Sequence, residues 1–203
     1  MKKCMTEWEK AQNGYLYDAN YDKEIVEART RCADLCYDFN HCRPSDTKRQ
    51  KELLEQIFGS IKGEPVITAP FYCDYGFNIS IGKNFYTNHN VTILDGAKVT
   101  FGDNVFIAPN CVFSTDGHAI DSGQRNQGLE IALPITVGDS VWIGANVSVL
   151  PGVTIGSNTI IGAGSVVNKN IPDGVIAVDN PCRVIRKITE ADKKKYPIFE
   201  SNC

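Results

Sequence analysis

The sequence has no strong net charge and no long hydrophobic run, and it contains little histidine. Its 203 residues carry 24 acidic and 21 basic side chains, and the net charge of −3 gives no electrostatic reason to expect nucleic acid as a partner. Asn, Ser or Gly interrupt the longest uncharged stretches, and no apolar run follows the lysines of MKKCMTEWEK. We therefore expect no membrane span and no signal peptide, and we predict a cytoplasmic protein. The 42% of hydrophobic residues exclude wholesale disorder.

The residues that bind zinc in proteins do not form a metal-site pattern here. Eight cysteines would make a disulfide framework only in a secreted protein, so we expect reduced and mostly buried thiols. Cys32, Cys36, His41 and Cys42 have the side chains of zinc ligands. Their C-x3-C spacing lies on a helical pattern, however, and no second CxxC pair accompanies it. We interpret these cysteines as core residues and expect no metal.

Charge and glycine are unevenly distributed along the chain. Residues 1–60 hold 21 of the 45 charged residues but only two of the 17 glycines. In this part, apolar residues recur at spacings of three and four, which predicts an amphipathic helix from near Asp22 to near Asn40. A second helix is predicted between Asp46, as its N-cap, and Gly59, as its C-terminal stop. Residues 1–60 are therefore predicted to form an N-terminal helical segment.

Residues 61–172 contain an internal repeat of six residues. The spacing is regular at the aliphatic positions Val137, Ile143, Val149, Ile155, Ile161 and Val167. A period of six fits neither a helix nor a simple strand, whose periods of about 3.6 and 2 would also bury polar positions. It predicts a solenoid in which each hexapeptide forms one short strand and one turn, and three hexapeptides form one coil. Gly or Asn is expected to adopt the turn conformations that have positive φ.

The repeat is interrupted over residues 115–134, which lack the inward aliphatic residues. A loop of this length in a compact domain normally has a functional reason. It contains His118, and an imidazole that titrates near neutral pH suits general-base chemistry. A Ser-His-Asp triad with Ser114 and Asp116 is not favoured, because such close sequence neighbours seldom converge in space.

Several segments together identify a family. They are NFYTNHNVTILD (84–95), FGDNVFIAPN (101–110), STDGH (114–118), PITVGDSVWIGANVSVLPGVTIG (134–156), IGAGSVVNKNIP (161–172) and NPCRVIRKI (180–188), together with the leading MTEWEKAQNGYLYDAN. These segments resemble the maltose and galactoside O-acetyltransferases of the hexapeptide-repeat acyltransferase superfamily. The resemblance covers nearly the whole chain. It implies a mainly β fold, a left-handed parallel β-helix with an N-terminal α-helical segment and a long inserted loop.

The resemblance also implies an activity. In this family, acetyl-CoA donates its acetyl group directly to a hydroxyl of a sugar of the galactoside, maltose or glucose type. By this resemblance His118 is the general base, and the backbone N–H of Ala145 stabilises the oxyanion. No metal is required. The family forms homotrimers with the active site between two subunits, and we carry this arrangement over as an expectation.

The family's acceptor site maps onto polar residues of this chain. The expected sugar contacts are Asp18, Arg29, Tyr86, Asn88 and Asp95, with the first match divided between Asp18 and Asn20. Such groups suit a polyhydroxylated ligand, because a carboxylate accepts several hydroxyl hydrogen bonds. Glu130 stands where some relatives have Met, and it either orients His118 or touches the sugar.

The cosubstrate acetyl-CoA is anionic at its nucleotide end, so an acidic protein needs a local basic segment to bind it. Residues 183–195 carry a net charge of +4, whereas the rest of the chain sums to −7. In the C-terminal extension, residues 173–203, the resemblance assigns Arg183 and Arg186 to the phosphates. It assigns the pantetheine groove to Ala145, Ala163, Asn168 and Lys169, and Trp142 to CoA or a neighbouring subunit. Some relatives have Ser in place of Ala145 and Thr in place of Asn168.

Two other readings stay open. The first is an acetyltransferase of the same superfamily that acts on serine, an antibiotic hydroxyl or a cell-envelope sugar. The second is a non-catalytic solenoid or a metal enzyme. A β-helix carbonic anhydrase needs three histidines around zinc, but His41 lies outside the repeats and leaves only His89 and His118 within them. A non-catalytic solenoid would have no reason for the 115–134 loop or for the Arg183 and Arg186 pair.

Overall fold

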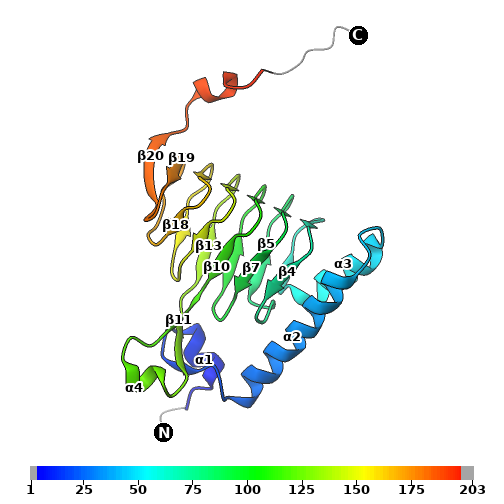
Figure 1. Ribbon diagram of the computed structural model, residues 1–203, viewed down its shortest axis with the longest axis vertical. Helices are drawn as coiled ribbons and strands as arrows, with labels where there is room; N and C mark the ends of the chain where they lie inside the picture. Colours follow the sequence, from blue (N-terminus) through cyan, green and yellow to red (C-terminus); the bar gives the residue numbers. More distant parts are fainter. Residues whose placement is uncertain (1–3, 198–203) are drawn as a thin grey trace.

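The computed structural model describes residues 4–197, and its main body is a three-sided parallel β-helix (Figure 1). Face 1 consists of β3 (Val66–Ile67), β6 (Tyr86–Thr87), β9 (Phe106–Ile107), β14 (Trp142–Ile143), β17 (Ile160–Ile161), β19 (Val175–Val178) and the antiparallel β20 (Arg183–Lys187). Face 2 consists of β4 (Phe71–Cys73), β7 (Val91–Leu94), β10 (Val112–Ser114), β15 (Ser148–Val149) and β18 (Val166–Val167). Face 3 consists of β2 (Ser60–Ile61), β5 (Ile79–Ile81), β8 (Val99–Phe101), β13 (Ile135–Val137) and β16 (Thr154–Ile155). The predicted parallel β-helix is confirmed.

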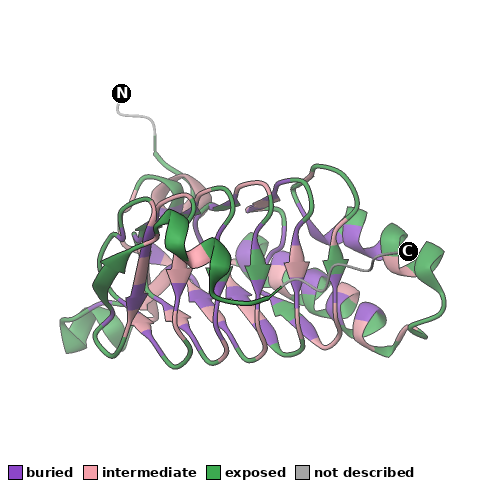
Figure 2. Ribbon diagram, turned by 90° about the horizontal axis from the view of Figure 1, so that it is seen from above, coloured by how far each residue is buried: buried purple, intermediate pink, exposed green. Residues whose placement is uncertain are grey.

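The core of the β-helix is built by the predicted aliphatic repeat. Each coil places its aliphatic residues above those of the preceding coil, as in the register Ile107, Ile143 and Ile161 on face 1. All three of these side chains are fully buried. Figure 2 shows buried residues recurring along the coils, with exposed positions at the turns. Burial of one continuous apolar column gives the stacked coils a common core, which no single coil could form alone.

Asparagine occupies most of the tight turns between faces. Positive φ occurs at Asn84, Asn90, Asn104, Asn110, Asn146 and Asn158, as the repeat predicted. The amide of Asn84 donates to Oδ1 of Asn104 at 3.0 Å, so these residues also link neighbouring coils.

The glycines that follow the inward aliphatic residues have a different role, and we correct that part of the prediction. Gly82 does not have positive φ. A Cβ at this position would lie 2.3 Å from the carbonyl oxygen of Gly102 on the next coil. A side chain there would therefore collide with the backbone of the neighbouring coil. The same close approach occurs at Gly144, where a Cβ would lie 2.6 Å from the backbone nitrogen of Ala163.

The N-terminal segment contains the two predicted helices and one short helix, α1 (Glu7–Gln12). The predicted Asp22–Asn40 helix is α2 (Lys23–His41), and the Asp22 side chain accepts from the backbone N–H of Ile25 at its start. The predicted second helix is α3 (Thr47–Ile57), capped by Asp46. Gly59 directly follows the C-cap Phe58, as predicted, but it lacks the positive φ of a glycine cap, and a Cβ on it would lie 2.0 Å from the carbonyl oxygen of Phe77. None of the described helices is long and apolar enough to cross a membrane.

The insertion at residues 115–134 has regular structure. It forms a hairpin of β11 (Asp116–His118) and β12 (Leu129–Ala132), with α4 (Ser122–Arg125) at its tip. Strand β12 also pairs with β1 (Tyr17–Asp18), so the insertion and the N-terminal segment share one small sheet. Figure 1 shows this sheet projecting from one edge of the β-helix, between faces 2 and 3.

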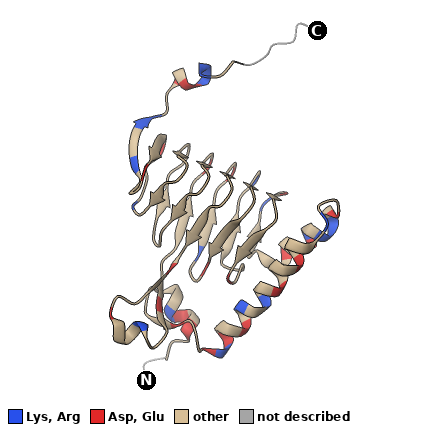
Figure 3. Ribbon diagram, in the orientation of Figure 1, with Lys and Arg blue, Asp and Glu red and all other residues tan. Residues whose placement is uncertain are grey.

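The C-terminal extension begins later than the predicted boundary at residue 172. Strand β19 pairs in parallel with β17, Ile160 opposite Ile176, and so it continues face 1 of the β-helix. The chain then reverses into β20 and the 3-10 helix η1 (Glu190–Lys194). Figure 3 shows basic residues on both elements. The N-terminal and C-terminal segments predicted at residues 1–60 and 173–203 include residues 1–3 and 198–203, which lie outside the described part of the chain.

The close approach of the coils gives a prediction. Gly82→Ala should lower the free energy of unfolding by about 1–3 kcal/mol, because its methyl group would overlap the backbone of the next coil. Gly164→Asn is the matched control. It has a φ of +74° and free space around a Cβ, and it should change stability by less than about 0.5 kcal/mol. Urea unfolding of both variants measures the difference, and equal stabilities would contradict the steric explanation.

Candidate active site

A cavity of about 350 Å³ lies at the edge between faces 2 and 3, where the insertion meets the N-terminal segment. Its walls come from separate parts of the chain: Tyr17, Arg29, Asp74, Tyr75, Leu94, Ser114, Asp116, Gly117, His118 and Glu130. Three carboxylates, two phenols, one guanidinium and one imidazole line it. The predicted residues Arg29, His118 and Glu130 are therefore brought together here, although more than 80 residues separate Arg29 from His118 in the sequence.

His118 and Glu130 lie opposite each other across the insertion hairpin. The register of β11 and β12 pairs these two residues, and 3.7 Å separates His118 Nδ1 from Glu130 Oε1. The amide of Asn20 donates to the same carboxylate oxygen at 3.2 Å. The His118 side chain is 61% exposed, so the rest of its ring is accessible from solvent. Both roles predicted for Glu130 fit this geometry, because its carboxylate faces His118 and also lines the cavity.

Asp116 lines the cavity, although the sequence suggested it only as a possible member of a Ser-His-Asp triad. It stands two residues before His118 on a strand, and alternation along a strand places both side chains on the same side. Its carboxylate accepts from the Tyr17 hydroxyl and from the backbone N–H of Gly96, each at 3.1 Å. Burial raises the pKa of Asp116 to about 6. Gly96 is required beside it, because a Cβ there would lie 1.8 Å from the carboxylate.

Arg29 and Asp74 also line the cavity. Arg29 extends from α2, donates to the Tyr75 hydroxyl at 3.0 Å and also donates to the carbonyl oxygen of Ala19. Burial raises the pKa of Asp74, and the positive charge of Arg29 opposes this shift. Asp74 follows directly after β4 and was not predicted as a site residue, since nothing in its local sequence pattern separates it from a turn aspartate.

Asp95 is not among the residues that line the cavity, and its contact with an acceptor stays a prediction. It is completely buried, and its Oδ1 accepts from the backbone N–H groups of Asp74 and Tyr75 at 3.1 and 2.9 Å. Asp95 therefore holds the turn that carries two lining residues. Burial raises the pKa of Asp95 to about 7.

The choice between Asp18 and Asn20 also changes with the structure. The Asp18 carboxylate accepts from the backbone N–H groups of Asn20 and Tyr21, so it caps a turn. Its neighbour Tyr17, which alternation on β1 points to the other side, lines the cavity instead. Asn20 reaches the site through Glu130.

The other predicted acceptor residues lie elsewhere on the β-helix. Tyr86 belongs to β6 on face 1, and Asn88 follows it at the turn into face 2. Trp142 lies on the same face and is 54% exposed. Ala145 lies at the turn after β14, one coil beyond the turn that follows β9. None of these four lines the cavity that contains His118. A single chain thus separates the predicted site residues into two groups at different edges.

The predicted CoA-binding residues are exposed. Ala163 follows β17, and Asn168 and Lys169 follow β18. Arg183 pairs with Asp179 at 2.6 Å, and Arg186 makes a bidentate pair with Asp192 at 2.7 and 2.8 Å. Both arginines lie on β20 and keep their side chains at the surface. A phosphate would compete with these carboxylates for the same guanidinium groups.

Asp95 should influence how stability varies with pH. An aspartate in the unfolded chain has a pKa of about 3.9, so the folded state holds this proton more tightly and stability falls as pH rises from about 4 to 7. Asp95→Asn keeps an oxygen for the two backbone N–H groups and cannot ionise. We expect its free energy of unfolding to fall less over this range than that of the wild type. Urea unfolding at several pH values tests this, and parallel curves would contradict it.

The family models and solved structures that match this chain agree with one another. A maltose acetyltransferase hexapeptide capping motif matches residues 10–63, and a bacterial transferase hexapeptide model with six repeats matches residues 134–169. The galactoside O-acetyltransferase of Escherichia coli is 47% identical over 172 residues, covering 85% of each chain.

Two solved structures are similar over almost their whole length. A galactoside acetyltransferase in complex with coenzyme A has a TM-score of 0.92 at 42% identity, covering 97% of this chain and 100% of that chain. A maltose O-acetyltransferase from Clostridium difficile has a TM-score of 0.90 at 45% identity, covering 93% and 100%. On this evidence the chain belongs to the maltose and galactoside O-acetyltransferase family of the hexapeptide-repeat acyltransferases.

Proposed function

We propose that this acetyl-CoA-dependent O-acetyltransferase acetylates a hydroxyl of a sugar, with His118 as the general base. The observation that carries the proposal is the position of His118 over a cavity lined by Asp74, Asp116 and Glu130. Carboxylates beside a basic imidazole can both bind a polyhydroxylated acceptor and prepare one hydroxyl for attack. The kinship with enzymes named for galactosides and maltose supports a sugar acceptor.

The chemistry is a direct acyl transfer. A sugar hydroxyl is a weak nucleophile until a positioned base removes its proton. A hydrogen bond from Nδ1–H to the Glu130 carboxylate, formed as the 3.7 Å separation closes, would select the tautomer that leaves Nε2 of His118 free to act as base. The acceptor oxygen then attacks the thioester carbon, the thiolate of CoA leaves, and the proton taken up by His118 neutralises it. No side chain is acylated, so Cys111 and Ser114 need not act as nucleophiles.

Acceptor binding is assigned to the cavity walls. Asp74 and Asp116, the latter held by Tyr17 and Gly96, offer their carboxylates to the acceptor. Arg29 is already bonded to Tyr75 and Ala19, so we assign it mainly to shaping the wall. Asp95 holds the backbone of Asp74 and Tyr75 through its two hydrogen bonds.

We further propose a homotrimer in which a second subunit completes each site. Face 1 exposes an apolar row in register across adjacent strands: Val66, Tyr86, Phe106, Trp142 and Ile160. Val66, Phe106 and Trp142 are more than 40% exposed, and a monomer leaves this row uncovered. Association through face 1 would bring Tyr86, Asn88 and the backbone N–H of Ala145 from one subunit to His118 of the next. The separation of these residues within one chain supports that arrangement.

The basic segment is proposed to hold the nucleotide end of acetyl-CoA. Arg183 and Arg186 present planar guanidinium groups at the surface of β20, and their present carboxylate partners are also exposed. Exposed pairs of this kind contribute little free energy, so a multiply charged phosphate group can replace the carboxylates. The pantetheine arm would then pass Ala163, Asn168 and Lys169 along the coils.

A cytoplasmic location is also part of the proposal. The seven cysteines that the structure describes are all free thiols. Two of them, Cys32 and Cys73, have sulfur atoms 3.5 Å apart without a bond. Unpaired neighbouring thiols suit a reducing compartment.

The role of His118 gives a direct prediction. His118→Ala should lower turnover by about 10²–10⁴-fold, since the hydroxyl loses its base, and the fold should be retained because the side chain is largely exposed. Release of free thiol from acetyl-CoA, followed with a panel of sugar and non-sugar acceptors, measures both turnover and substrate class. Glu130→Gln serves as the matched control and should reduce turnover less than His118→Ala. Near wild-type transfer by His118→Ala would refute the mechanism, and thiol release only with a non-sugar hydroxyl would refute the sugar acceptor.

Mixed trimers test whether two subunits share a site. His118→Ala and Asn88→Ala should each be inactive alone. When equal amounts of the two variants are refolded together, random assembly pairs an intact His118 with an intact neighbouring Asn88 at about a quarter of the sites, so about a quarter of wild-type activity should return. Mixing His118→Ala with the double variant His118→Ala/Asn88→Ala should restore none. Mixed trimers without recovered activity would contradict the shared site.

A further inference from the structure

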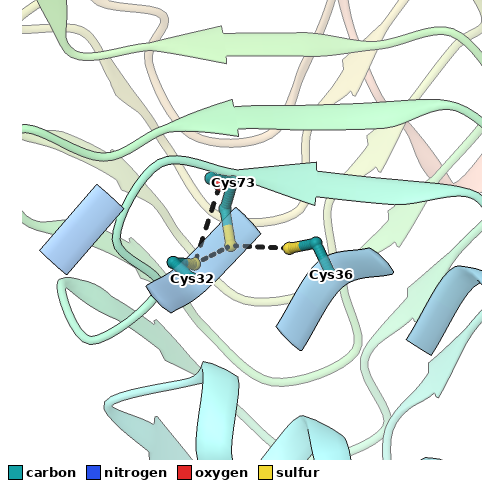
Figure 4. Close-up of side chains that lie close together, drawn as sticks. All are labelled: Cys32, Cys36 and Cys73. Atoms are coloured by element: carbon teal, nitrogen blue, oxygen red, sulfur yellow. Dashed lines mark hydrogen bonds between the residues drawn. The ribbon is translucent and has the colours of Figure 1, made fainter. Parts of the chain in front are cut away.

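Three buried cysteines form a cluster outside the cavity. Cys32 and Cys36 lie one turn apart on α2, and Cys73 ends β4, on which that helix packs (Figure 4). The sulfur atom of Cys73 is 3.5 Å from that of Cys32 and 3.8 Å from that of Cys36. All three sulfur atoms lie within 4.8 Å of one another. Cys42 is close to Cys32 and Cys36 in the sequence, but it does not belong to the cluster. The third member is Cys73, which is 31 positions after Cys42.

The spacing suits a centre bonded to three sulfur atoms. With bonds to sulfur of about 2.3 Å, the sulfur atoms of a three-coordinate centre lie about 3.3 Å apart at bond angles of about 90°, and about 4.0 Å apart when the centre is planar. The two sulfur–sulfur separations that involve Cys73, 3.5 and 3.8 Å, fall within this range. Among the described residues, no fourth Cys, His, Asp or Glu belongs to the group. A structural zinc ion requires four ligands, so three sulfurs alone do not meet its needs.

The net charge of the bound site distinguishes between the thiol-binding metal ions that three sulfur atoms could hold. The cluster lies in the core, where an uncompensated charge is costly. Three thiolates around a monovalent or divalent metal ion would leave a net negative charge in this core. Three thiolates around a trivalent centre are neutral.

We propose that Cys32, Cys36 and Cys73 form a three-sulfur binding site for trivalent arsenic, supplied as arsenite. One molecule of As(OH)₃ condenses with three thiols: three As–O and three S–H bonds break, three As–S bonds form, and three molecules of water leave. No oxidant or reductant is needed, because arsenic stays trivalent and sulfur keeps its oxidation state. Both the reactant and the product are neutral, which allows entry into and retention in an apolar core.

Occupancy would crosslink α2 to the first complete coil. Cys32 and Cys36 belong to the helix, and Cys73 belongs to the β-helix. Core packing otherwise holds these elements together, with two hydrogen bonds between the Asn40 side chain and the backbone of Phe71 at 2.8 and 2.9 Å. A ligand that binds only the folded arrangement stabilises it. We expect arsenite to raise the unfolding midpoint of the reduced protein by at least about 2 °C.

Intact mass spectrometry of the reduced full-length chain tests the site. With arsenite, the wild type should gain the mass of one arsenic atom less three hydrogen atoms, which reports three As–S bonds. Cys36→Ser should instead gain AsOH less two hydrogen atoms, because one hydroxyl stays on arsenic, and its thermal shift should shrink. Cys111→Ser removes a buried thiol outside the cluster and should behave as the wild type.

Several results would overturn the assignment. They are a wild-type adduct that keeps a hydroxyl on arsenic, a three-bond adduct that persists in Cys36→Ser, and tighter binding of Zn²⁺ than of arsenite. Circular dichroism checks that Cys36→Ser is folded. Cys36→Ala is the second variant if the serine is not tolerated in the core, and it should give the same two-bond adduct.

Discussion

The close stacking of coils is the constraint on which the rest of this structure depends. Each strand is only two to four residues long within the parallel faces, so it is stable only when hydrogen-bonded to the strands above and below it. That spacing requires an aliphatic residue inside, an asparagine or glycine at the turn, and a glycine wherever the next coil approaches. The six-residue repeat satisfies all three requirements, and the resulting column is rigid.

A rigid column explains why the candidate site lies where the repeat fails. The insertion leaves the column after β10, and its hairpin is held on one side by the β-helix and on the other by β1 of the N-terminal segment. Strand pairing sets His118 against Glu130, and strand alternation sets Asp116 beside His118. His118, Glu130 and Asp116 are thus positioned by backbone pairing and not by an irregular loop.

The electrostatics of the molecule follow the same division. Acidic groups gather around the cavity, where burial raises the pKa of Asp74, Asp95 and Asp116. β20 and η1, near the C-terminal end, carry a further group of basic residues (Figure 3). The cysteine cluster lies in neither region, since it joins α2 to the first coil in the core.

The sequence by itself determined the repeat architecture, because spacing along the chain is a local property. A period of six excluded simple helices and strands, the apolar spacing and the caps Asp22 and Asp46 placed two helices, and the interruption at residues 115–134 located the insertion. It also singled out His118, since an imidazole stands out in a loop that the repeat does not need. The family resemblance added the chemistry that these residues are expected to perform.

Only the tertiary structure decided which distant residues share a surface. Asp74, Asp116 and Tyr17 line the cavity and Asp95 is fully buried, because burial and strand orientation depend on how separated segments of the chain pack. The cysteine cluster includes Cys73 and not Cys42, which is nearer to Cys32 and Cys36 in the sequence. Tyr86 and Asn88 lie at a different edge of the β-helix from His118. Contacts of this kind form between elements far apart in the chain, so no spacing within the sequence encodes them directly.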